Sequence, residues 1–155
     1  MSITSLDMEQ ATTLTLEVRN PATGVLIRTV ARAGTADVER AIEEGVKGRT
    51  EMRNLPAHRR SEILRKASEM IATRHEELSR LLCLENGKTI RQCRAEMTAT
   101  QRLFLDFSEE AKRIHGETIP MDAVAGLENM IAYTIRQPLG LIAGIIPFKE
   151  PLIKS

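Results

Sequence analysis

One stretch decides the fold that the sequence predicts: Gly140-Leu141-Ile142-Ala143-Gly144-Ile145-Ile146-Pro147-Phe148-Lys149-Glu150-Pro151. Residues 140–146 are apolar or glycine without alternation, which is typical of a strand buried on both faces of a parallel sheet. Pro147 ends the predicted strand because proline has no N–H for the ladder, and Pro151 suits the first turn of a following helix. Open α/β sheets bind ligands at such a point, where a strand passes through a tight loop into a helix.

The composition is compatible with one ordinary domain. At 155 residues the chain can bury a substantial core, and its 22 Lys+Arg nearly cancel its 21 Asp+Glu. This balance predicts neither a nucleic-acid partner nor an anionic membrane surface. The longest apolar run, residues 139–148, is about half of what a membrane span requires. The N-terminus shows no signal-peptide pattern, so we expect a cytoplasmic protein with reduced thiols.

The first third of the chain predicts an arm, a hairpin and a helix. Residues 1–13 have no periodicity, and we expect a flexible arm there. Alternation over residues 14–19, a turn cluster at Asn20-Pro21-Ala22-Thr23-Gly24 and β-branched residues over 25–30 predict a β-hairpin. A helix with Thr35 as its N-cap is expected to reach about residue 50.

Three further helices and a strand follow. One begins after Pro56, and its predicted buried stripe is Ile63, Leu64, Ala67, Met70 and Ile71. The next ends at Asn86-Gly87, where glycine can adopt the left-handed conformation. The longest covers residues 90–114, with a seam of Ile90, Cys93, Met97, Thr100, Phe104, Phe107, Ala111 and Ile114. A seam of this length leaves a coiled coil open beside packing within the chain. Residues 130–136 alternate as a strand.

Five motifs resemble, in order and spacing, those of the NAD(P)-dependent aldehyde dehydrogenases. They are Asn20-Pro21-Ala22-Thr23-Gly24, Arg59-Arg60-x-x-Ile63-Leu64, Glu85-Asn86-Gly87-Lys88, the segment from Arg113 to Pro120, and the segment from Pro138 to Pro151. The resemblance covers the chain after residue 13 and the amino-terminal third of a family chain. It implies an α/β fold class, as the incomplete amino-terminal part of an aldehyde dehydrogenase-like fold. The parts expected are a β-hairpin, a bundle-like helical layer, a projecting strand and the first strand of a parallel cofactor-binding sheet.

The same resemblance implies a division of the chain and a site. Residues 14–155 would form a partial cofactor-binding domain, with an oligomerisation-type strand near 130–136. The backbone of Ile145, Ile146, Pro147 and Phe148 would line the nicotinamide-ribose side of NAD or NADP. The family has an oxyanion-hole Asn where this chain has Lys149. Because oxyanion donors work when they are preorganised, a long, flexible lysine that can pair with Glu150 is expected to weaken that site.

The remaining candidate residues predict no chemistry of their own. Cys83 and Cys93 lie among apolar residues and in no metal or CxxC spacing, so packed or half-exposed thiols are expected. His58, His75 and His115 stand among charged residues and are expected at the surface. Neither GxGxxG nor GxxxxGK[ST] occurs, and no metal site is expected. Glutamates interleave the basic residues 58–66, which indicates a solvated helix face.

The family resemblance implies oxidation of a small aldehyde to a carboxylic acid or acyl product with NAD or NADP. This chain lacks the family's catalytic Cys and Glu region, so we expect it to be a truncated amino-terminal fragment that is inactive alone. Two alternatives stay open. One is a non-catalytic fragment that pairs with related subunits in a homo- or hetero-oligomer, and the other is a truncated gene product.

Overall fold

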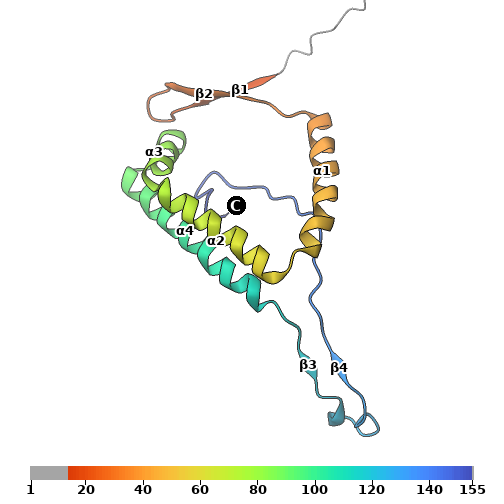
Figure 1. The fold of residues 1–155 in the computed structure, drawn as a ribbon. Coiled ribbons are helices and arrows are strands. Elements are labelled where there is room, and N and C mark those ends of the chain that lie inside the picture. Colours follow the sequence, from red (N-terminus) through yellow and green to blue (C-terminus); the bar gives the residue numbers. More distant parts are fainter. Residues whose placement is uncertain (1–13, 155) are drawn as a thin grey trace, which may run out of the picture.

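The computed structural model describes residues 14–154. The arm predicted for residues 1–13 lies outside the described residues. Figure 1 shows the hairpin and the helices arranged around the terminal segment, with an arm that projects away from it. The elements, in order, are β1 (Thr15–Arg19), β2 (Leu26–Ala31), α1 (Thr35–Asn54), α2 (Ala57–Thr73), α3 (His75–Asn86), α4 (Ile90–Arg113), β3 (Thr118–Ile119), the 3-10 helix η1 (Met121–Ala123) and β4 (Ala132–Tyr133).

The amino-terminal hairpin forms as predicted. β1 pairs with β2 in antiparallel register, and the Asn20 carboxamide oxygen accepts two backbone N–H groups of the turn at 2.9 and 3.2 Å. Gly24 closes the turn with φ 71°, in the left-handed region that glycine favours. An ion pair of 2.7 Å joins Arg28 to Glu85, so the hairpin rests against the end of α3.

The start and end of α1 differ from the prediction. Gly34, not Thr35, is the N-cap, and the Asp37 carboxylate accepts the Gly34 N–H at 2.8 Å. That hydrogen bond and Arg40 lower the pKa of Asp37. The helix continues past residue 50 to Asn54, and the next residue, Leu55, is extended. The proline that follows Leu55 disfavours the helical conformation there, and this ends the helix.

The core lies where α4 packs along α2 and α3 (Figure 1). Its buried apolar side chains are Leu82, Cys93, Met97 and Ala111. Small hydroxyl residues complete the contact, and Ser68 of α2 donates to the carbonyl of Gln101 on α4 at 2.9 Å. Cys93, Met97, Thr100 and Ala111 of the predicted seam are therefore buried within the chain, without a coiled-coil partner.

Part of the predicted stripe on these helices is wrong. Ile63 and Met70 on α2 are more than half exposed, as are Phe107 and Ile114 at the end of α4. The face of α2 that is buried instead carries Ser61 and Ser68. Serine is small enough to let two helix backbones approach, but a pattern search for apolar residues passes over it.

Ion pairs cover the exposed helix faces, as the charge pattern predicts. Glu76 of α3 receives two hydrogen bonds from Arg94 of α4, at 2.9 and 2.8 Å, and a third from Arg80. The Arg94 hydrogen bond is the main cause that lowers the pKa of Glu76 to about 2. On α2, Arg59 pairs with Glu62 and Arg65 with Glu69.

The projecting strand is shorter than predicted. Of residues 130–136 only Ala132–Tyr133 pair, with Thr118–Ile119, and the Thr134 N–H donates to the Glu117 carbonyl at 2.8 Å. The two strands leave the body of the molecule together as an arm (Figure 1). A two-stranded arm buries neither face, so residues of both faces stay exposed.

The strand predicted for residues 140–146 does not form, and the helix start predicted at Pro151 is a turn instead. A buried parallel strand needs a neighbour on each side, and the described residues supply none. Residues 140–146 run unpaired between the helices, and Leu141 packs on Gly45 of α1. A Cβ at Gly45 would lie 2.6 Å from Leu141 Cδ1, so a larger residue there would require the Leu141 side chain to move.

Candidate functional site

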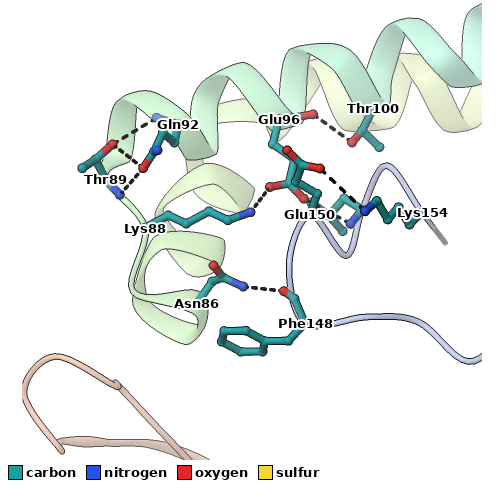
Figure 2. Close-up of polar contacts among 10 residues, drawn as sticks. Asn86, Lys88, Thr89, Gln92, Glu96, Thr100, Phe148, Glu150 and Lys154 are labelled. Atoms are coloured by element: carbon teal, nitrogen blue, oxygen red, sulfur yellow. Dashed lines mark hydrogen bonds and ion pairs between the residues drawn. The ribbon is translucent and has the colours of Figure 1, made fainter.

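Although it forms neither strand nor helix, the terminal loop of residues 147–154 is held on the corner between α3 and α4. Figure 2 shows two contacts that fix its backbone. The Asn86 side-chain amide donates to the carbonyl of Phe148 at 2.8 Å, and the N–H of Leu152 donates to Glu96 Oε1 at 3.2 Å. The loop is thus anchored at both of its ends by side chains far away in sequence.

Glu96 belongs to an ion pair beneath this loop. Lys88 Nζ lies 2.6 Å from Glu96 Oε2, and the two side chains are 18% and 4% exposed. A carboxylate this deeply buried costs several kcal/mol unless its charge is paired and its oxygens are hydrogen-bonded. Here one oxygen binds the ammonium and the other binds the loop, so both are used (Figure 2).

The corner that presents Asn86 and Lys88 is well defined by local hydrogen bonds. Gly87 ends α3 with φ 75°, and its N–H donates to the Cys83 carbonyl at 3.0 Å. Thr89 then caps α4 in a reciprocal pair with Gln92. The predicted glycine C-cap is confirmed, and it places two polar side chains on the same side of the corner.

Within the loop, Glu150 has φ 55°. A non-glycine residue in this region carries about 1–3 kcal/mol of backbone strain, which the surrounding contacts must offset. Its carboxylate lies 4.0 Å from Lys154 Nζ. Glu150 thus pairs with Lys154, not with Lys149, whose side chain is exposed.

The predicted cofactor positions lie together along one exposed segment. Ile145 is 99% exposed, Ile146 44% and Phe148 70%, and Pro147 is also exposed. No hydrogen bond within the described residues engages the backbone of residues 145–147. Their backbone polar groups are thus not used by hydrogen bonds within the described residues.

The sequence analysis missed Glu96 and Asn86 as loop anchors. One signal could have identified Glu96: it stands beside Met97 on the seam between Cys93 and Thr100, where a carboxylate needs a partner. No comparable signal exists for Asn86, because its partner is a backbone carbonyl 62 residues away.

A groove of about 720 Å³ runs between the carboxyl-terminal half of α1 and residues 136–142. Its lining combines apolar side chains with arginines: Met52, Ile114, Leu139, Leu141, Ile142, Arg49, Arg53, Arg60 and Arg136. It lies apart from the residues that hold the terminal loop. The groove marks the side of α1 on which residues 136–142 lie.

The other candidate residues carry no site. Cys83 is half-buried and Cys93 is buried, as predicted, and burial together with the nearby Cys83 raises the pKa of Cys93. A thiol with a raised pKa is a poor nucleophile. His58 and His115 are exposed, whereas His75 is half-buried beside Thr98 at 3.1 Å. Residues 14–154 contain no metal-binding cluster of His, Cys, Asp or Glu, and none of their helices is long and apolar enough to cross a membrane.

The sequence of this chain is similar to those of known enzymes. Glutarate-semialdehyde dehydrogenase of Pseudomonas putida is 38% identical over 137 residues, which cover 88% of this chain and 28% of that protein. Aspartate-semialdehyde dehydrogenase 1 of Pseudomonas canavaninivorans is 37% identical, over 88% of this chain and 29% of its own length. The chain therefore spans under a third of the length of these relatives.

The fold of this chain is also similar to that of a solved structure. NADP-dependent glyceraldehyde-3-phosphate dehydrogenase from Bacillus halodurans, complexed with NADP, superposes with a TM-score of 0.86 at 26% identity. The match covers 92% of this chain and 30% of that one. The sequence profile of the aldehyde dehydrogenase family itself matches residues 8–155. With the motifs in order and the fold shared, the chain belongs to the aldehyde dehydrogenase family.

Proposed function

We propose that this chain supplies the amino-terminal segment of an enzyme that oxidises a small aldehyde to a carboxylic acid or acyl product with NAD or NADP. The observation that carries the proposal is the family match over residues 8–155. The relatives named above are semialdehyde dehydrogenases, and the superposed structure holds NADP. The two free thiols support a reducing, cytoplasmic location.

In this proposal the residues of the chain bind and orient rather than react. A nicotinamide nucleotide, when bound, would accept the hydride. The exposed, unpaired backbone of residues 145–147 would contact its nicotinamide-ribose side, and the anchored loop would hold Lys149 near the aldehyde oxygen. Residues 14–155 would thus form part of a cofactor-binding domain that is completed by other sequence.

The test replaces the matching segment of the Pseudomonas putida glutarate-semialdehyde dehydrogenase with residues 1–155 of this chain. We expect the chimera to reduce a nicotinamide nucleotide in the presence of an aldehyde. We expect the 155-residue chain alone to show no turnover with any aliphatic or aromatic aldehyde. The reason is that its two thiols are packed and no base or pyrophosphate-binding helix accompanies them.

Absorbance of the reduced nicotinamide measures both reactions, and the unmodified Pseudomonas enzyme is the control. A folded chimera without activity would contradict the proposal. So would turnover by the chain alone that is lost in Cys83→Ala or Cys93→Ala, because the nucleophile would then lie within these residues.

A second candidate function is subunit association, and exposed apolar side chains favour it. Leu139, Ile142 and Ile145 are 93%, 72% and 99% exposed on the unpaired segment. On the arm, Ile131 and Tyr133 are 88% and 71% exposed. Several large apolar side chains that are this exposed are typical of interaction sites.

We therefore expect the isolated chain to associate, and a variant that ends at Gly140 to associate much less. The physical reason is that truncation removes most of the unpaired apolar segment, whose edges and faces are uncovered. Size-exclusion chromatography with light scattering measures the mass. If both chains run as monomers, the segment is not an interaction surface. If only an Ile131→Ser variant dissociates, the arm forms the contact instead.

A further inference from the structure

The loop of residues 147–154 keeps a defined path without the sheet that a strand at 140–146 would need. The preceding segment has no ladder partner among the described residues, and the loop itself contains no helix. Residues 151–153 form a turn, and side chains from the corner between α3 and α4 add hydrogen bonds to the loop backbone (Figure 2).

Three side chains of this corner act on the loop. Asn86 donates to the Phe148 carbonyl at 2.8 Å, and Glu96 accepts the Leu152 N–H at 3.2 Å. Lys88 holds the other oxygen of Glu96 at 2.6 Å. Glu96 lies in the first third of α4, a helix that packs on two others, so the position of its carboxylate is fixed by helix packing.

The two hydrogen bonds to the loop lie on either side of Lys149 and Glu150. Phe148 lies directly before Lys149, and Leu152 follows the positive-φ residue Glu150. Fixing a carbonyl on one side and an N–H on the other restricts the backbone of the peptide units between them. The path of the loop, and with it the root of the Lys149 side chain, is then set by the corner.

We propose that Asn86, Lys88 and Glu96 are positioning residues that preorganise the 147–152 loop before any ligand or further sequence is present. Lys88 acts indirectly, because its ammonium binds one oxygen of the buried Glu96 carboxylate and leaves the other oriented toward Leu152. The catalytic meaning of the loop rests on the proposed function. The placement itself involves neither substrate nor cofactor, so the two proposals can fail separately.

Hydrogen exchange measured by NMR on the full 155-residue chain tests this inference. We expect Glu96→Met to speed exchange of the Leu152 amide about tenfold or more, the scale of one lost hydrogen bond to a charged group. Asn86→Ala, at the exposed end of α3, should loosen residues 148–152 to a similar degree. The amide of Met97 in α4 should keep its exchange rate in Asn86→Ala, because that change leaves the helix core intact.

Two further variants separate placement of the loop from general stability. Lys88→Met should speed Leu152 exchange, whereas Lys88→Arg, which keeps the cation, should restore most of the protection. Glu110→Met is the matched control, since Glu110 lies on the same helix in an exposed ion pair with Arg113 at 2.7 Å, and it should leave the loop unchanged.

Unchanged Leu152 exchange in both Glu96→Met and Asn86→Ala would overturn the proposal. An equal rise at Leu152 and Met97 in Asn86→Ala would overturn it as well, because the effect would then be global. Should Glu96→Met not fold, Asn86→Ala and the two Lys88 variants decide the matter by the same comparison of loop and helix amides.

Discussion

Replacing Lys149 by Asn in the chimera should raise its turnover number by about 10²-fold, the scale on which one oxyanion donor acts. An Asn amide is short, neutral and restricted to few rotamers, so it can be preorganised toward the developing oxyanion. Lys149 carries a flexible, hydrated charge on the exposed side of its loop. Holding that charge in place in a closing pocket costs conformational entropy and desolvation.

Steady-state kinetics should show this gain in the turnover number, with little change in the KM for the nicotinamide nucleotide, because the expected cofactor contacts are made by backbone. Lys154→Asn is the matched control: it makes the same substitution a few residues away, where the lysine lies 4.0 Å from Glu150. Its turnover should stay unchanged. Equal rates for the chimera that retains Lys149 and for its Lys149→Asn variant would show instead that the lysine is a competent donor.

Truncating Met97 to Ala should lower the free energy of unfolding of the chain by about 2–5 kcal/mol, the range for a buried methionine. Met97 is 2% exposed and lies where α4 meets its neighbours. The buried apolar core among the described residues consists of Leu82, Cys93, Met97 and Ala111. With so few members, the loss of one large side chain leaves a cavity that nothing nearby can fill.

Urea unfolding followed by circular dichroism measures the effect, and Met70→Ala is its matched control. Met70→Ala removes the same atoms from α2, but Met70 is 56% exposed. This variant should therefore lower the free energy of unfolding by under about 1 kcal/mol. Similar losses in the two variants would mean that the α4 contact is not the core of the molecule.

Much of the local structure could be predicted from the sequence. The hairpin follows from the turn chemistry of Asn20 and Gly24, and the end of α3 follows from the left-handed conformation of Gly87. These features depend on residues within a few positions of each other, so propensity and pattern suffice. The family also followed from motif order alone, and the comparisons confirmed it.

The sequence by itself determined the hairpin, the order of the four helices and the family. The tertiary structure alone decided which faces are buried and what holds the loop. The apolar pattern predicted Ile63 and Met70 as buried, yet α2 packs through Ser61 and Ser68, because close helix contact favours small side chains. Residues 140–146 have the composition of a buried strand but no strand partner among the described residues. Without such a partner to hydrogen-bond with, the segment does not form a strand. Asn86 and Glu96 reach the loop across 62 and 56 residues, and such contacts exist only once the helices have packed.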